Sequence, residues 1–164
     1  MENRVFVVGL IVGILATVTM DVVAMVARRL GIAGRGPRRT GPDLIGRWIG
    51  YLLQGKFRHT DILQTPPLRG ELLLGLAAHY SIGIVLTLVY VGLLVVTHAT
   101  PTALNAILFG TATTVFPWFL MFTSQGMGWL GRDAGDAHLA RISLFNHIMF
   151  GLGIALWMAV IRPI

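Results

Sequence analysis

Four long apolar segments, each carrying few charges, dominate the pattern of hydrophobic and polar positions along the chain: residues 5–27, 72–96, 103–124 and 142–161. A helix needs about 20 apolar residues to cross the hydrocarbon core of a bilayer, so each segment is long enough to span it. The pattern predicts an all-α fold, a four-transmembrane-helix bundle that forms a single membrane domain over residues 1–164. Asp21 lies inside the first segment and Arg28 and Arg29 follow it, so we expect a retained span rather than a cleaved signal peptide.

A shorter pattern lies in the long loop over residues 28–71. Apolar residues recur there at helical spacing: Leu44, Ile45, Trp48, Ile49, Leu52 and Leu53. Pro42 suits the first turn of a helix and Gly55 suits the residue after its end. We predict a short amphipathic helix over about residues 42–54, either lying in the membrane interface or packed against the cytoplasmic end of the bundle.

Small and polar residues recur at four-residue spacing in every apolar segment. The four sets are Gly9, Gly13, Thr17 and Asp21; Gly75, His79, Gly83 and Thr87; Ala106, Gly110, Thr114 and Trp118; and Ser143, His147, Gly151, Ala155 and Ala159. Residues four apart share one face of a helix, and small residues allow helices to approach closely in lipid. We therefore expect Gly9, Gly13, Gly75, Gly83, Gly110 and Gly151 to be helix-packing positions.

Three ionisable residues lie on these faces at similar depth. Asp21, His79 and His147 are each six to eight residues from a charged residue at the same predicted end, or roughly 9–12 Å at 1.5 Å per residue. A charge at membrane depth costs roughly 2.5–3.5 kcal/mol, so it is rarely present without a partner or a function. We predict a functional centre around these residues, to which Asn146, Thr17, Ser143 and Gln125 contribute polar groups.

Composition and charge support a membrane location. The 164 residues are 55% apolar and 12% charged, with a mean hydropathy of +0.75 and no cysteine, which excludes disulfide and thiolate chemistry. The net charge is +6. Eleven basic residues lie in the loops 28–71 and 125–141, whereas only Arg4 and Arg162 lie on the opposite side. The positive-inside rule then places both termini away from the cytoplasm, and the basic loop favours anionic lipid over nucleic acid as its partner.

The polar cluster is compatible with several functions. It could fasten helices together, or it could be a proton-linked binding or transport site, since a carboxylate on the first of four spans resembles the layout of small multidrug transporters. Two histidines and one carboxylate also match a metal site in number, and His79 with His147 could be the axial pair of a haem b. An accessory subunit, as a homo-oligomer or within a larger membrane complex, is the remaining alternative.

Enzymatic activity is left open by the sequence. Walker, nucleophile-elbow, zinc-protease and dinucleotide motifs are absent, which argues against kinase, protease and dehydrogenase chemistry. The loops hold His59, Asp61, Asp133, Asp136 and His138. These residues could extend a metal site into that of a hydrolase, but we interpret each of them individually as a solvated loop residue.

Pro117 lies within the third apolar segment and predicts a kink. It leaves the carbonyl of Thr113 without its usual helical donor. We interpret it as a tolerated membrane proline rather than as a hinge.

Three short segments carry a resemblance to a known family: residues 16–21 (ATVTMD), residues 79–83 (HYSIG) and residues 146–147 (NH). At these positions the chain resembles a family of small bacterial inner-membrane proteins of unknown function. The resemblance extends over nearly the whole chain. It implies a location in the bacterial inner membrane and supplies no activity.

Overall fold

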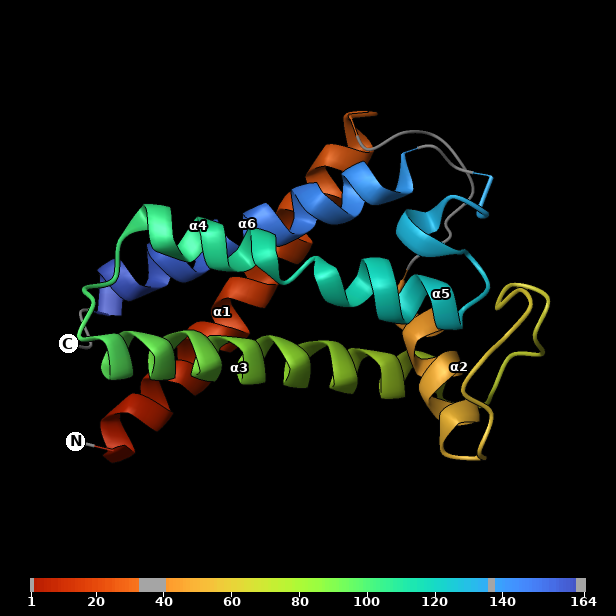
Figure 1. Cartoon of the computed structure of the whole chain (residues 1–164), viewed down its shortest axis with the longest axis horizontal. Helices are drawn as coiled ribbons and strands as arrows, with labels where there is room; N and C mark the ends of the chain where they lie inside the picture. Colours follow the sequence, from red (N-terminus) through yellow and green to blue (C-terminus); the bar gives the residue numbers. More distant parts are fainter. Residues whose placement is uncertain (1, 33–40, 136–137, 162–164) are drawn as a thin grey trace. The chain divides into compact units, whose positions relative to one another are not determined.

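The computed structural model describes residues 2–32, 41–135 and 138–161. The regular elements in these residues are all helices (Figure 1). They are α1 (Glu2–Arg29), α2 (Pro42–Leu52), α3 (Glu71–Thr97), α4 (Ala103–Ala112), the π-helix η1 (Phe116–Met121), α5 (Phe122–Ser124), the 3₁₀ turn η2 (Trp129–Gly131) and α6 (Leu139–Ile161).

Four helical segments are long and apolar enough to cross a membrane: Arg4–Arg29, Glu71–Thr97, Ala103–Ser124 and Leu139–Ile161. The prediction of an all-α protein with four potential spans is therefore confirmed. Each segment begins and ends within three residues of the range expected from hydropathy.

The third span is not one regular α-helix. Regular α4 ends at Ala112, a turn follows at Thr113 and Thr114, and η1 then winds as a π-helix around Pro117. Proline cannot donate to the carbonyl four residues earlier, and its ring clashes with that carbonyl. The kink expected at Pro117 is thus a change of helix type over about two turns.

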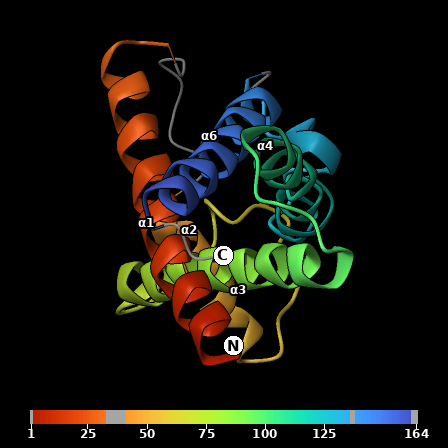
Figure 2. The ribbon, with the colours of Figure 1, turned by 90° about the vertical axis from the view of Figure 1, so that its left-hand side faces the viewer.

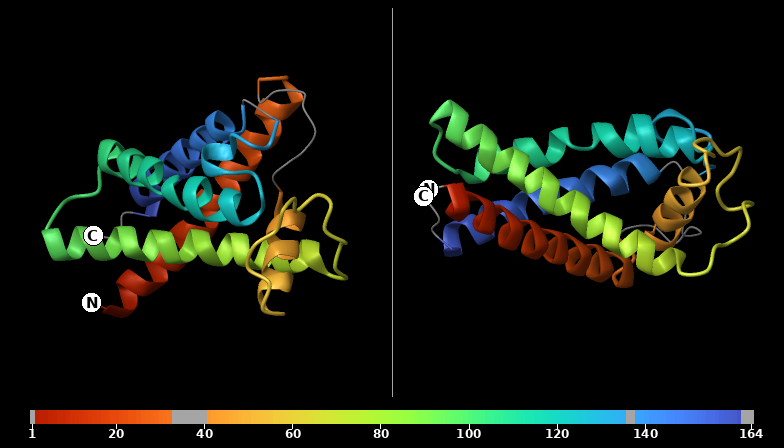
Figure 3. Two further views of the ribbon diagram at one scale, coloured as in Figure 1. Left: turned by 45° about the vertical axis from the view of Figure 1, so that its right-hand side comes forward. Right: turned by 90° about the horizontal axis from the view of Figure 1, so that it is seen from below.

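The described residues form two compact units. The first unit contains α1, the part of α3 from Tyr80, α4 up to Thr113, and the part of α6 from Leu144. Its core is made of residues from all four spans: Val8, Val12, Ala16, Tyr90, Val91, Leu94, Ala106, Phe150, Ile154 and Met158. The first turn of α1, the turn between α3 and α4, and the last turn of α6 lie at the same end of this unit (Figure 3).

Glycines bring the spans of the first unit into close contact. A Cβ atom added to Gly13 would lie 2.7 Å from Cα of Ile84, where α1 crosses α3 obliquely (Figure 1, Figure 2). A Cβ atom added to Gly151 would lie 2.6 Å from the carbonyl oxygen of Ala106 in α4. Such backbone-to-backbone contact is the usual means by which small residues hold helices together in lipid.

The second unit consists of α2, the connection to α3, the first nine residues of α3, and the segment Thr114–Ser143. Its core is a separate apolar cluster: Leu44, Ile62, Phe122, Met127, Ala134 and Leu139. Helix α2 begins at Pro42 after an extended Gly41. It ends in a Schellman motif, in which Lys56 N–H donates to Tyr51 O at 2.9 Å and Gly55 has a φ of +83°.

Helix α2 packs on the beginning of α3. A Cβ atom at Gly46 would meet the carbonyl oxygen of Glu71, and one at Gly75 would meet that of Pro42. Arg47 forms a forked ion pair with Glu71, with Nε–Oε2 at 2.8 Å and Nη2–Oε1 at 2.7 Å. The helix expected over about residues 42–54 is therefore present as Pro42–Leu52, and within this unit it packs against the beginning of α3.

Candidate functional site

Asp21 in α1 and Tyr80 in α3 form a hydrogen-bonded pair in the first unit. The phenolic hydroxyl of Tyr80 donates to Oδ2 of Asp21 at 3.1 Å, and both side chains are half-buried. Thr17, one turn before Asp21, is fully buried and donates its hydroxyl to Gly13 O at 2.8 Å. A Cβ atom at Gly83 would meet this hydroxyl, so Gly83 leaves the space that Thr17 occupies. The pair therefore presents a carboxylate one helical turn from a close contact of α1 with α3.

His147 in α6 contacts the end of α4. Its Nδ1 lies 2.7 Å from Oγ1 of Thr113, which in turn donates to Gly110 O at 2.6 Å. A hydroxyl has one proton to donate, so the His147 ring donates from Nδ1 to Thr113. Thr113 thereby satisfies a carbonyl in the last turn of α4 and holds the imidazole of His147 in one orientation.

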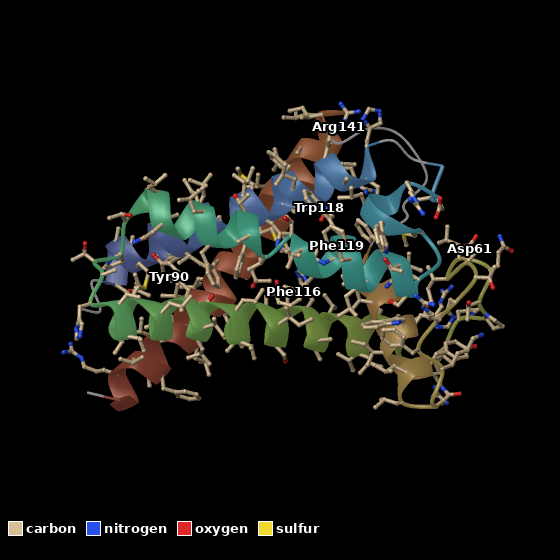
Figure 4. All side chains as sticks on the ribbon, viewed as in Figure 1. Asp61, Tyr90, Phe116, Trp118, Phe119 and Arg141 are labelled. Atoms are coloured by element: carbon tan, nitrogen blue, oxygen red, sulfur yellow. The ribbon has the colours of Figure 1, made fainter. Side chains whose placement is uncertain are left out.

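Hydrogen bonds connect neighbouring spans around the first unit. Besides the bonds of Asp21 and His147, the hydroxyl of Tyr90 in α3 donates to Asn105 Oδ1 in α4 at 2.7 Å. Tyr90 lies between these two helices (Figure 4). Trp157 Nε1 in α6 donates to Thr19 Oγ1 in α1 at 3.0 Å. Two of the contacts thus fasten helices with uncharged side chains, and the Asp21–Tyr80 contact uses an acid.

The other residues expected at the site lie in both units. His79 is half-buried and is the last residue of the second unit on α3. Asn146 in the first unit and Ser143 in the second are half-buried on α6, whereas Gln125 is only 1% exposed in the second unit. A joint site of Asp21, His79 and His147 stays a prediction.

The residues that the structure describes contain no group of three or more His, Asp or Glu side chains that could hold a metal ion. The metal alternative stays a prediction.

His59 is buried in the second unit, so its interpretation as a solvated loop residue is wrong. Its side chain is 6% exposed, and its Nδ1 lies 3.0 Å from Oγ1 of Thr65. Thr65 donates its own proton to Asp61 O at 3.0 Å, so the His59 ring donates from Nδ1 and carries a lone pair on Nε2. Burial lowers the pKa of His59, and the nearby charge of Lys56 lowers it further. The ring is therefore held neutral.

The segment that contains His59 covers the turn after α5. His59 N–H donates to Ser124 O at 2.8 Å, and Ile62 N–H donates to Gln125 O at 3.0 Å. A Cβ atom at Gly126, which has a φ of +84°, would meet the carbonyl of Thr60. These contacts bury the side chains of Ser124 and Gln125, each 1% exposed.

Arg47 connects three parts of the second unit. Beyond its ion pair with Glu71, its Nη1 donates to the carbonyls of Thr65 at 3.0 Å and Ile62 at 3.3 Å. The Glu71 carboxylate also accepts from Leu68 N–H at 2.8 Å and raises the pKa of Arg47 through its hydrogen bond. Arg47 is therefore a structural cation of this unit, although it contributes to the basic charge of the loop.

Sequence reasoning missed Tyr80 as a site residue. The four-residue spacing singled out His79 and Gly83, and Tyr80 falls between them. Residues three apart also share a helical face, so the spacing of Tyr80 and Gly83 contained the signal. A phenol in an apolar span is a second signal, because its hydroxyl needs a partner there.

Comparison with curated proteins and with solved structures gives no significant match to this chain. A family model described as a protein of unknown function, DUF2938, matches residues 10–161, which include all the site residues discussed above. The match agrees with the expectation of an uncharacterised family and supplies no activity. The chain therefore belongs to the DUF2938 family of proteins of unknown function.

Proposed function

We propose that this protein is a proton-linked membrane protein that binds or transports a positively charged small molecule, with Asp21 as the binding group. The observation that carries the proposal is the half-buried carboxylate of Asp21, held by the Tyr80 hydroxyl at 3.1 Å within a potential membrane span. Fastening alone does not require an acid, since Tyr90–Asn105 and Trp157–Thr19 join spans through uncharged groups.

The chemistry of a carboxylate at this depth favours exchange between a proton and a cation. An ionised carboxylate in a low-dielectric environment is costly in free energy. The cost is removed either when the carboxylate takes up a proton or when a cation binds beside it, and the two events exclude each other. Tyr80 donates to one oxygen of this carboxylate and so holds the acid in position between α1 and α3. Binding of a cation would then release a proton, which is the elementary step of proton-linked transport.

The proposal is tested with tetraphenylphosphonium as an apolar probe cation. We expect the purified protein to bind this cation and to release a proton on binding, which is measured by calorimetry in buffers of different ionisation enthalpy. Asp21→Asn should abolish both binding and proton release. Tyr80→Phe, which removes the hydrogen bond to Asp21, should change the affinity for the cation. Tyr90→Phe, which removes a hydroxyl from the same helix away from Asp21, should not.

Two results would contradict this proposal. Binding that is absent in the wild-type protein, or that is unchanged by Asp21→Asn, would exclude Asp21 as a cation site. A Soret band in the visible spectrum, or a stoichiometric metal, that is lost in His79→Ala or His147→Ala would instead favour the haem or metal alternative.

We also propose that the protein lies in a bacterial inner membrane with both termini on the periplasmic side. The support is the distribution of basic residues, eleven in the loops 28–71 and 125–141 against Arg4 and Arg162 on the other side. The common end of α1, α6 and the α3–α4 turn in the first unit agrees with spans that run alternately up and down (Figure 3).

A further inference from the structure

The end of α2 and the residues that follow it form a small exposed surface outside the four potential spans. We call it the basic–apolar tip and define it by Leu52, Leu53, Lys56, Phe57 and Arg58. Leu53 is 78% exposed, Phe57 42% and Leu52 39%, and both cations are exposed. Adjoining exposed apolar side chains outside the spans are typical of an interaction surface, and here two cations lie beside them.

The tip is held in its conformation by specific contacts. Gly55 closes the Schellman motif that ends α2, and Trp48 Nε1 donates to Phe57 O at 2.9 Å. The rings of Trp48 and Phe57 meet edge to face, with centroids 5.9 Å apart, and Lys56 Nζ lies 5.4 Å from the centre of the Tyr51 ring. Backbone hydrogen bonds therefore hold Leu53 and Phe57 in place, although residues 56–58 follow the helix without regular secondary structure.

The charges of the tip favour an anionic partner. The tip itself contains Lys56 and Arg58 and no acid. Asp61, in the segment that follows (Figure 4), accepts from Leu63 N–H at 2.9 Å through its side chain. Basic residues beside exposed leucine and aromatic side chains form the usual combination for the headgroup layer of a membrane, where the apolar groups enter and the cations meet phosphate.

We propose that the basic–apolar tip inserts into the headgroup layer of a membrane that contains anionic phospholipid. The occupant is a lipid surface because the chain carries four potential spans and so has lipid beside it. Helix α2 itself is held by α3 through Gly46, Gly75 and the Arg47–Glu71 pair, so the insertion involves its end and not the whole apolar stripe of the helix. This inference is independent of the ligand proposed for Asp21.

The absence of cysteine in the chain allows a direct measurement of depth. Leu53→Cys and the control Gln64→Cys, an exposed polar position of the same unit, are each given a spin label in the full-length protein. Both are placed in nanodiscs of phosphatidylcholine with or without phosphatidylglycerol. We expect the label at Leu53 to be accessible to oxygen and protected from a water-soluble nickel reagent, and more so with phosphatidylglycerol. The label at Gln64 should stay accessible to nickel.

Charge reversal tests the role of the cations. Lys56→Glu with Arg58→Glu should abolish the additional protection that phosphatidylglycerol gives to the label at Leu53, as should high salt. Equal nickel accessibility at Leu53 and Gln64 in both kinds of nanodisc would overturn the proposal. Protection of the label at Leu53 from nickel that is unchanged by phosphatidylglycerol and by the charge reversal would also overturn the proposal. Protection that persists in detergent without phospholipid would overturn it in favour of a protein partner.

Discussion

The imidazole of His59 is buried in the second unit although it lies in a long and strongly basic loop. The Nδ1 proton points to Thr65, and burial and the charge of Lys56 lower the pKa of the ring, which favours its neutral form. Asp21 in the first unit acquires Tyr80 as its partner from another helix. In both cases the chemistry of the residue depends on its neighbours in the folded protein, which are Thr65 and Lys56 for His59 and Tyr80 for Asp21.

The pKa of His59 is lower in the folded than in the unfolded protein, so the unfolded chain binds a proton first as the pH falls. The stability gained from the neutral ring is complete above about pH 6.5 and is lost progressively below it. We therefore expect the melting temperature of the protein in detergent to fall more steeply from pH 7 to pH 5 than that of His59→Asn. Asparagine keeps a donor toward Thr65 and does not titrate. Parallel pH profiles for the two proteins would contradict this prediction.

At the scale of elements, close backbone contact determines how helices associate. The recurring apolar residues of α2 correctly predicted a helix. The close contact of this helix with α3, however, involves Gly46 and Arg47, and the apolar Leu53 after the helix is exposed. Gly153 of α6 also lies close to α1, since a Cβ atom added there would be 2.9 Å from Cα of Ala16. Gly153 is not among the residues of α6 that recur at four-residue spacing. Helix periodicity identifies a face, but the partner helix decides which residue of the face is used.

Gly151→Ala tests this close packing. The new Cβ atom would lie 2.6 Å from Ala106 O and 2.8 Å from Cα of Ile107, so the two helices must move apart. We expect a loss of about 1–3 kcal/mol in the free energy of unfolding, measured in mixed micelles. The matched control is Gly92→Ala in α3, where nothing lies within 4 Å of the added atom. Alanine there should be neutral or should stabilise the helix by up to about 1 kcal/mol. Equal effects at both glycines would mean that the contact of α6 with α4 is not as described.

At the scale of the whole molecule, hydropathy and charge act along the entire chain. Four potential spans alternate with loops whose basic residues fall on one predicted side. Of the nine cations between residues 28 and 71, Arg47 is engaged by Glu71, whereas Lys56 and Arg58 are exposed. The positive-inside rule counts basic residues in the loops on each side of the membrane. The excess of basic residues on one predicted side remains large when Arg47 is left out.

Topology is tested with a reporter enzyme that is active only outside the cytoplasm. Fused after Ile164, the reporter should be active in a bacterial host, and inserted beside Lys56 it should be silent. A reporter within residues 97–102 should be active, as the connection between α3 and α4 is expected on the same side as the termini. The opposite set of activities would reverse the orientation and place the basic loops outside.

The sequence by itself determined the four spans and the helix after Pro42. The reason is that insertion into a bilayer depends on the summed hydropathy of about 20 consecutive residues, which is a local property. Pro117 likewise indicated where the third span departs from a regular helix, although the extent of the π-helix required the structure.

Only the tertiary structure decided the polar contacts. The pairing of Asp21 with Tyr80, the burial of His59 against the turn at Ser124 and the contact of Gly75 with α2 each join residues that are far apart in the chain. A hydrogen bond or a glycine contact depends on atoms within a few ångströms, and periodicity along one helix does not specify which helix lies opposite. The sequence therefore specified which segments are long and apolar enough to cross a membrane, and the packing specified which of the polar groups meet.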